Sequence, residues 1–355
     1  MFKRTVTLSL LLALAMAAGA ALFHARPAAP VMAAGFYAGQ LADGRSLQLV
    51  FYPSGTVAAH LVGEPYDATL SFKTNTQHQV EFGVASNGGE GRWQVCGLNF
   101  GRGSLPARLD GRLFTVRATN GLAFTATNIG AFKEHHREIG AHAVGRGGGK
   151  NFTATWPELH DGVPFHESFS KLFAAAAQGE GLTFTTGGYE LIWEGFKDGG
   201  ASWDWEGSLD IRPVWLAPNL VSLCEDRYEF TGGAHGEAGY IGRNYILDGG
   251  KAREFKLEDL FRRDVNWTNA LSPLILRELR AQGASGVMAG AGGTASVTGF
   301  TADELASFNV DSAGLIIHFP DYAVGSHAEG LFSVLIPWPE LRPLLDPAGP
   351  GRLFP

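Results

Sequence analysis

Short segments in which apolar and polar residues alternate fill the first third of the chain. Over residues 35–132 these segments recur at close spacing and end in turn signals, such as Pro53-Ser54-Gly55 and Thr119-Asn120-Gly121. Alternation with a period of two places one face of a strand in a core, and an Asn-Gly pair favours a tight hairpin turn. The pattern predicts a small antiparallel β-domain, either a barrel or a sandwich, over residues 35–132.

A polar segment follows and interrupts the alternation. Residues 133–150 begin with charged side chains and end in a cluster of glycines, a composition typical of linkers. Three histidines, His135, His136 and His142, lie close together here, but their spacing matches no standard metal-ligand motif. We therefore interpret the segment as a solvated linker between two domains and predict no metal site.

Helical periodicity appears next. Apolar residues recur at helical spacing between Phe165 and Ala176, Pro164 suits the first helical turn, and Gly179 suits the end of the helix. These features predict an amphipathic helix over residues 164–178. Alternation returns after the helix and predicts strands near residues 182–195, 201–213, 219–230 and 240–247.

The last part of the chain mixes both patterns. We expect a short helix over Lys256–Phe261, a longer one over Thr268–Gln282, and a capped helix that begins at Thr301. Paired strands are expected over Gly314–Phe319 and Leu331–Ile336.

The order of these elements and the composition predict the fold class. Helices and strands follow one another without regular βαβ order, so residues 151–348 are expected to form an α+β domain with an antiparallel sheet and packed helices, in two halves, 151–223 and 224–348. The chain has 355 residues, enough for two domains, and its 48 glycines and 24 phenylalanines are typical of turn-rich sheet. A net charge of −7 without a basic patch argues against a nucleic-acid partner.

A loop that holds three glycines around one histidine is the most distinctive local motif. Residues 228–237 read Tyr-Glu-Phe-Thr-Gly-Gly-Ala-His-Gly-Glu and follow an alternating run, so the loop is expected at the end of a strand. Gly232, Gly233 and Gly236 permit backbone conformations that other residues adopt only at a cost. His235 either hydrogen-bonds a ligand from this preformed loop or fixes the loop by bonding its own neighbours.

The first residues have the features of an export signal. Lys3 and Arg4 precede an apolar run from Leu8 to Leu22, and Val31-Met32-Ala33 offers a small-residue cleavage pattern. A signal peptide over residues 1–33 predicts a periplasmic or secreted protein with no membrane span in the mature chain. The alternative is an uncleaved N-terminal anchor, because the stretch from Val6 to Phe23 is at the lower limit of what spans a bilayer.

The chain has two cysteines, Cys96 and Cys224. In an oxidising compartment an even number of cysteines favours a disulfide, which here would join the N-terminal domain to the strand before the glycine-histidine loop. The alternative is two buried thiols, because cysteine is often a small core residue.

The loop belongs to a longer series of motifs that resembles a known domain. The chain carries, in this order, Tyr228 to Gly236, then Asp259-Leu260-Phe261, then Tyr322 to Gly330, and then Ile336-Pro337-Trp338. This series resembles the extracytoplasmic domain of unknown function that lysozyme-sensing anti-sigma factors share with peptidoglycan deacetylases, where it is an accessory module. The stretch from Thr153 to Leu223 resembles the companion domain that usually precedes it.

The resemblance implies a binding role. In this family the two segments usually form one α+β unit outside the membrane that binds cell-wall-related partners rather than catalysing a reaction. The chain departs from the family at His327, where an aromatic residue is common, shortly before Gly330, which we expect to shape the loop. The metal-binding Asp and His pattern of the deacetylase catalytic domain has no counterpart, and no sigma-binding segment precedes the signal, so neither activity is carried over.

The candidate ligand-binding residues come from these motifs and from a tryptophan-rich segment. They are His235, Glu237, Trp203, Trp205, Tyr322 and His327. The two tryptophans share one face of a predicted strand, where an exposed pair would stack on sugars and a buried pair would belong to the core. We predict no cofactor.

These observations favour a non-catalytic envelope protein. We expect it to bind peptidoglycan or a cell-wall-active protein such as a lysozyme, because the export signal and the family motifs are present while standard catalytic motifs are missing. The alternative is an envelope glycan hydrolase or deacetylase-type enzyme that uses His235 and nearby carboxylates as acid and base.

Overall fold

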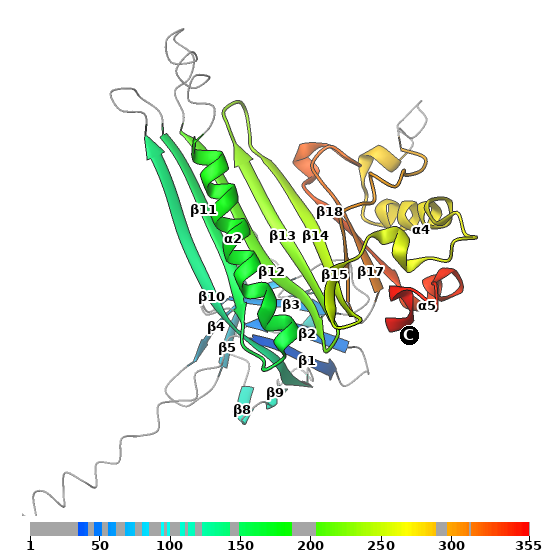
Figure 1. Ribbon diagram of the computed structural model, residues 1–355, viewed down its shortest axis with the longest axis horizontal. Coiled ribbons are helices and arrows are strands. Elements are labelled where there is room, and N and C mark those ends of the chain that lie inside the picture. The colour runs from blue at the N-terminus through cyan, green and yellow to red at the C-terminus, as the bar shows by residue number, and fades with distance from the viewer. Residues whose placement is uncertain are drawn as a thin grey trace, which may run out of the picture.

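The protein has the predicted α+β fold, with long antiparallel strands and few helices (Figure 1). The computed structural model describes residues 35–41, 46–51, 56–61, 68–74, 80–84, 94–95, 98–99, 107–110, 113–117, 123–142, 149–186, 204–288, 297–311 and 314–354. Three sheets occur in this part of the chain, of which the largest runs through both the N-terminal and the central strands.

The N-terminal segment is β-structure, as its alternation predicts. Its strands are β1 (Gly35–Leu41), β2 (Ser46–Phe51), β3 (Thr56–Leu61), β4 (Ala68–Thr74), β5 (Val80–Val84), β6 (Gln94–Val95), β7 (Leu98–Asn99), β8 (Ala107–Asp110) and β9 (Leu113–Arg117). Strands β1 to β5 pair antiparallel with their neighbours in sequence. Closure of these strands into a barrel or a sandwich stays a prediction.

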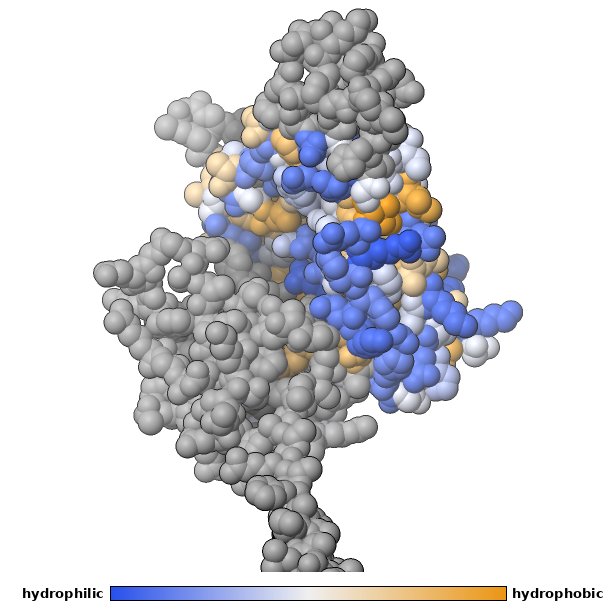
Figure 2. Space-filling model, turned by 90° about the vertical axis from the view of Figure 1, so that its left-hand side faces the viewer, coloured by the Kyte–Doolittle hydropathy of each residue, from blue (hydrophilic) through white to orange (hydrophobic). Residues whose placement is uncertain are grey.

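The predicted linker is wrong where the structure describes it. Strand β10 runs from Ala123 to His142; its first half pairs with β1 and β9, and its second half pairs with β11 (Gly149–Leu159). The charged residues from Lys133 onward therefore lie within a sheet, and hydrophilic residues gather on this side of the molecule (Figure 2). A high density of charge shows that side chains are solvated, but it does not show that the backbone is irregular.

A helix connects two parallel strands of the large sheet. Strand β11 leads into α2 (Pro164–Thr186), and β12 (Trp205–Ala217) then pairs parallel to β11. Strands β13 (Leu220–Phe230), β14 (Glu237–Asp248) and β15 (Lys251–Glu254) continue the sheet in antiparallel order. The helix covers one face of β10, β11 and β12 (Figure 1).

Helix α2 is longer than its sequence predicts. It continues past Gly179 to Thr186, so the strand expected from residue 182 is wrong up to 186, and residues 187–195 lie outside the described part. The helix approaches β10 and β11 so closely that a Cβ at Gly181 would collide with the side chains of Ile139 and Phe152. The second glycine of this helix thus permits close packing instead of ending the helix. Buried Lys150 donates a hydrogen bond of 2.8 Å to the carbonyl of Phe184 in the last turn.

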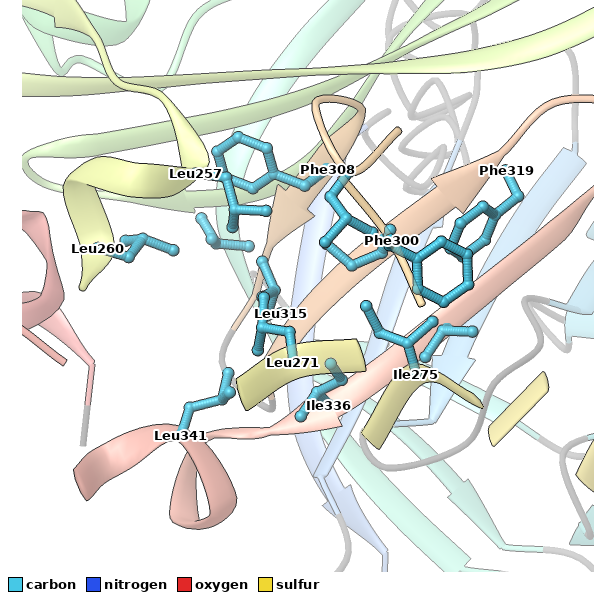
Figure 3. Packing of buried hydrophobic residues seen from close by; sticks show 14 of the residues in the cluster. Leu257, Leu260, Leu271, Ile275, Phe300, Phe308, Leu315, Phe319, Ile336 and Leu341 are labelled. Carbon is cyan, nitrogen blue, oxygen red and sulfur yellow. The ribbon is translucent and has the colours of Figure 1, made fainter. Parts of the chain in front are cut away.

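The C-terminal part packs against the β13–β14 hairpin. It contains η1 (Leu257–Leu260), α4 (Trp267–Ala281), η2 (Ser285–Val287), β16 (Phe308–Val310), β17 (Gly314–Phe319), η3 (His327–Glu329), β18 (Phe332–Pro337), α5 (Trp338–Leu341), η4 (Arg342–Leu344) and η5 (Pro350–Leu353). Strands β16, β17 and β18 form an antiparallel sheet in that order, and α4 packs on it through a shared apolar core (Figure 3).

One predicted helix in this part is a turn. Residues 302–305 form a turn, although the predicted capping contacts are present: Glu304 accepts hydrogen bonds from the backbone and the hydroxyl of Thr301. The capping residues therefore stabilise a single turn, and no helix continues from it.

A chain of buried hydrogen bonds fixes the C-terminal sheet on the hairpin. Ser222 of β13 donates to Asn244 of β14 and accepts from Asn309 of β16. The oxygen of Asn309 bonds His318 Nε2 of β17 at 2.8 Å, and His318 Nδ1 bonds Ser333 of β18 at 2.9 Å. Because buried polar groups must keep their partners, this network permits one alignment of the two sheets.

Two expectations fall partly outside the described residues. Cys224 is buried in β13, while Cys96 and the whole predicted signal segment lie outside, so the disulfide and the export signal stay predictions. Among the described helices, none combines the length and the apolarity that a bilayer span requires.

Candidate functional site

The glycine-histidine loop connects β13 to β14. It occupies residues 231–236, and Gly232 and Gly233 have φ angles of +108° and +98°, which favour glycine. Position 236 requires glycine for a different reason: Gly236 is buried, and a Cβ there would lie 2.5 Å from the ring of Tyr228. The glycines therefore set the path of the backbone that presents His235.

Three of the predicted site residues meet at this loop. The ring of His235 stacks on the ring of His327 with 3.7 Å between centroids and 14° between planes. Tyr322 lies beside both rings, at 5.9 Å from His235 and 5.8 Å from His327. We call His235, Tyr322 and His327 the ring cluster.

Hydrogen bonds fix the ring cluster. The Nδ1 atom of His235 faces the carbonyl of Gly236 at 3.1 Å, and a carbonyl only accepts, so Nδ1 carries the proton. The Nε2 atom then accepts the hydroxyl proton of Tyr322, at 2.8 Å. His235 thus takes one of the two roles considered from its sequence, because it bonds its own loop, and it also supports the neighbouring ring of Tyr322. Hydrogen bonding of a ligand by His235 stays a prediction.

A buried carboxylate orients the second histidine. His327 Nδ1 donates to Asp321 Oδ2 at 3.1 Å, and the same oxygen accepts from the backbone of Ala238 at 3.3 Å. The side chain of Asp321 is only 7% exposed. Asp321 was not among the candidates from sequence, although its place directly before Tyr322 in the motif could have drawn attention to it.

Tyr322 has an unusual backbone. Its φ angle is +66°, the only positive value at a residue other than glycine in the described part of the chain. For such a residue the left-handed region costs about 1–2 kcal/mol. The side chain is nonetheless 61% exposed, so burial of the ring does not compensate for this strain. Strained residues of this kind cluster at functional sites.

The segment after Tyr322 is held rigid by Glu329. Its carboxylate accepts hydrogen bonds from Ser285 and from the backbone and hydroxyl of Ser326, in that way closing a capping box on η3. The hydroxyl of Ser285 and the bonds from Ser326 lower the pKa of Glu329 to about 2. Gly330, with φ at +77°, then ends η3.

Two other predicted site residues, Trp205 and Glu237, make their contacts with residues outside the ring cluster. The half-buried Trp205 lies under the ammonium of Lys150, at 4.3 Å, and near Phe184 of α2, so its contacts are on the helix side of the sheet. Glu237 is exposed at the start of β14, opposite Glu229. Trp203 lies outside the described residues.

A pocket of about 920 Å³ lies next to the ring cluster, between the outer edge of β14 and residues 300–308. We call it the edge pocket. The segment from Pro320 to Ala323 serves both features, because its two end residues line the pocket and its two central residues belong to the ring cluster region. Sequence patterns did not reveal this pocket because its walls come from segments far apart in the chain.

A carboxylate pair lies inside the large sheet. Asp210 of β12 and Asp226 of β13 stand directly opposite each other in the antiparallel register. Burial raises the pKa of both, while nearby Arg212 opposes the shift. The described residues contain no cluster of histidine, cysteine or carboxylate side chains suited to a metal ion.

The fold and the site together define a class: an α+β protein whose C-terminal sheet packs on a long hairpin and whose exposed ring cluster lies at the end of that hairpin. Residues 258–339 match the family described as a protein of unknown function, DUF3298. The predicted resemblance to a domain of unknown function is thereby confirmed for this segment, which contains Tyr322 and His327. The companion resemblance over residues 153–223 stays a prediction.

Two solved structures resemble this chain. A member of the DUF3298 family from Bacteroides fragilis is 20% identical with a TM-score of 0.46, over 62% of this chain and 97% of that one. A DUF3298 family protein from Pseudomonas aeruginosa is 16% identical with a TM-score of 0.43, over 63% of this chain and 97% of that one. A search of curated proteins gives no match. At these scores the likeness carries no argument about function.

Proposed function

We propose that the protein is a non-catalytic envelope module that binds peptidoglycan glycan through the ring cluster. The observation that carries this proposal is Tyr322, whose ring is 61% exposed although its backbone is strained. A costly conformation that presents an aromatic ring to solvent is expected where the ring contacts a partner.

The chemistry of the ring cluster suits a sugar. Aromatic and imidazole rings stack on the apolar faces of pyranose rings, while hydroxyl and carboxylate groups hydrogen-bond the sugar hydroxyls. Tyr228, 39% exposed, lies against Gly236 of the same loop, and the exposed Glu229 and Glu237 stand opposite each other on the other face of the hairpin. The hydrogen bonds of His235 and His327 hold the rings in place before a ligand arrives, which lowers the entropic cost of binding.

The location of the protein is part of the same proposal. The apolar run and cleavage pattern of residues 1–33 support export, and peptidoglycan lies outside the cytoplasmic membrane. A fusion of these residues to alkaline phosphatase, which is active only after export, should yield active phosphatase. Inactive phosphatase would show that residues 1–33 do not direct export and would contradict an envelope location.

Co-sedimentation with purified sacculi tests the binding. The protein should pellet with sacculi, Tyr322→Ala should lose most of this binding, and Tyr322→Phe should keep it because the ring remains. Leu172→Ala is the matched control: it removes another exposed apolar side chain, 49% exposed, on the outer face of α2. Equal pelleting of Tyr322→Ala and the unaltered protein would contradict the proposal.

A cell-wall-active protein such as a lysozyme is the other ligand that the sequence suggests. Calorimetric titration of the protein with lysozyme distinguishes the two ligands. Heat of binding that disappears in Tyr322→Ala, together with no binding to sacculi, would replace the glycan by a protein ligand at the same ring cluster.

One arrangement favours a second candidate function, a glycan hydrolase or deacetylase. His327 is oriented by the buried Asp321, as a general base is oriented in many hydrolases. Release of soluble fragments or acetate from peptidoglycan by the purified protein, abolished in His327→Ala and His235→Ala, would establish this function. Absence of release leaves the binding function.

A further inference from the structure

The edge pocket lies along a part of β14 that pairs on its outer edge with none of the described strands. Strand β15 pairs only with residues 245–248 of β14, so the preceding part of β14 borders the pocket with its outer edge. The Ser307 hydroxyl occupies this edge: it accepts from the backbone of Gly242 at 3.2 Å and donates to the carbonyl of Tyr240 at 2.6 Å. Because Ser307 takes the place of a partner strand, the edge is blocked to an added peptide strand.

The walls of the edge pocket are largely apolar and aromatic. A volume of about 920 Å³ is within the range of small-molecule sites. Several wall residues belong to the rigid C-terminal core, among them Leu257, Phe300, Phe308 and Phe319 (Figure 3). Trp267, half-buried, lines the pocket and stacks on Phe261 at 5.8 Å, which fixes the plane of its ring. The pocket is therefore a preformed feature of the fold.

The arginines of the pocket are already neutralised. Arg227 contacts Glu225 at 2.6 Å and Glu180 at 2.5 Å. Arg243 contacts the same Glu225 at 3.2 Å and Glu254 at 3.5 Å. The side chain of Glu225 is 11% exposed, so the contacts of both arginines with Glu225 are shielded from solvent, while the arginines themselves are 33% and 38% exposed. Each arginine is therefore already paired with two carboxylates, which makes it a poor partner for an anionic ligand.

The remaining charge on the lining is mainly negative. Asp303 and Glu304 lie on the turn at one side, and Glu258 lies on the other side. Lys256 also lines the pocket, but its ammonium is 4.0 Å from Glu258 and the two side chains are 80% and 54% exposed, so this pair is weak and leaves Glu258 open to a ligand cation. The hydrogen bond from the backbone of Thr301 lowers the pKa of Glu304, so this carboxylate is charged at neutral pH. Carboxylates around aromatic walls are the arrangement that favours organic cations, through both charge attraction and cation–π contact.

We propose that the edge pocket binds an organic cation, an amine with an apolar body that packs against the aromatic walls while its ammonium groups pair with Asp303, Glu304 and Glu258. This site is distinct from the ring cluster and does not depend on the function proposed for it. The two sites share only the short segment from Pro320 to Ala323.

Calorimetric titration of the full chain with hexamethylenediamine tests this site. Its neutral analogue hexanediol has the same carbon chain without charge. We expect saturable binding of the diamine, at least about tenfold tighter than that of hexanediol, and weaker binding at high salt. The double variant Asp303→Asn, Glu258→Gln should weaken diamine binding at least about fivefold, because it removes two ammonium partners without changing their size.

Two controls keep the test decisive. Asp264→Asn removes an exposed carboxylate outside the pocket lining and should leave diamine binding unchanged. Leu172→Ala, on α2 and outside the pocket lining, should also leave it unchanged. The diamine titration and the sacculus assay measure the two sites separately, so failure here and failure of the ring cluster are distinguishable. Equal binding of diamine and diol, no binding at millimolar diamine, or an equal loss in Asp264→Asn would each overturn the proposal.

Discussion

At the residue scale, the site depends on how one histidine and one tyrosine hold each other. His235 is fixed by the carbonyl of Gly236 and accepts the hydroxyl of Tyr322, and Tyr322 keeps a positive φ angle in this position. The loop motif pointed to His235, and the family motif pointed to Tyr322 and His327. The sequence could not reveal that their rings stack, because 87 residues separate His235 from Tyr322.

The pairing of these side chains predicts an energetic coupling. Tyr322→Phe should lower the free energy of unfolding by about 0.5–1.5 kcal/mol, because His235 loses its hydrogen-bond donor. In a His235→Ala background the same change should cost much less, so a double-mutant cycle measured by urea denaturation should give a coupling of that size. Additive effects of the two substitutions would show that the hydroxyl does not stabilise the loop.

At the element scale, the sequence predicted the type of most elements but not their limits. Strands β13, β14 and β17 lie close to their predicted ranges because their alternation is regular. The predicted limits of β10 and α2 were wrong for one reason: charge clusters and glycines usually end an element. Here the pairing of β10 with β11 and the close packing of α2 at Gly181 override that tendency. Tertiary contacts of this kind leave no local signal.

The two glycines of α2 provide a matched test of this packing. At Gly179 a Cβ would meet nothing within 4 Å, so Gly179→Ala should raise the free energy of unfolding by up to about 1 kcal/mol. Gly181→Ala adds the same helix propensity but pushes against Ile139 and Phe152, and overpacking costs about 1–3 kcal/mol. It should therefore be less stable than Gly179→Ala. Equal stabilisation by both substitutions would contradict the close approach of α2 to β10 and β11.

At the scale of the whole molecule, the buried network of Ser222, Asn244, Asn309 and His318 aligns two sheets so that the ring cluster and the edge pocket lie side by side along one segment. The motif alone indicated a binding domain. The pocket and the carboxylate pair depend on which strands become neighbours in the sheet. Strand pairing cannot be read from the local patterns of a single sequence.

The carboxylate pair makes stability depend on pH. Burial raises the pKa of Asp210 and Asp226 above the unfolded value, which is about 3.9. The folded protein therefore holds these protons more tightly than the unfolded chain. The contribution of this pair to the free energy of unfolding is largest below about pH 4 and is lost as the pH rises through the raised pKa values. Asp226→Asn should raise the unfolding temperature at pH 7 more than at pH 4. The exposed Asp264→Asn is the control, and an effect independent of pH would contradict a raised pKa.

The central claim is that the ring cluster is the surface that meets peptidoglycan, and NMR titration with soluble, lysozyme-derived glycan fragments tests it most directly. The predicted result is saturable chemical-shift change confined to His235, Tyr322, His327 and their loop neighbours, with no such change in Tyr322→Ala. Shifts that gather elsewhere on the molecule, or none at millimolar fragment, would contradict the claim.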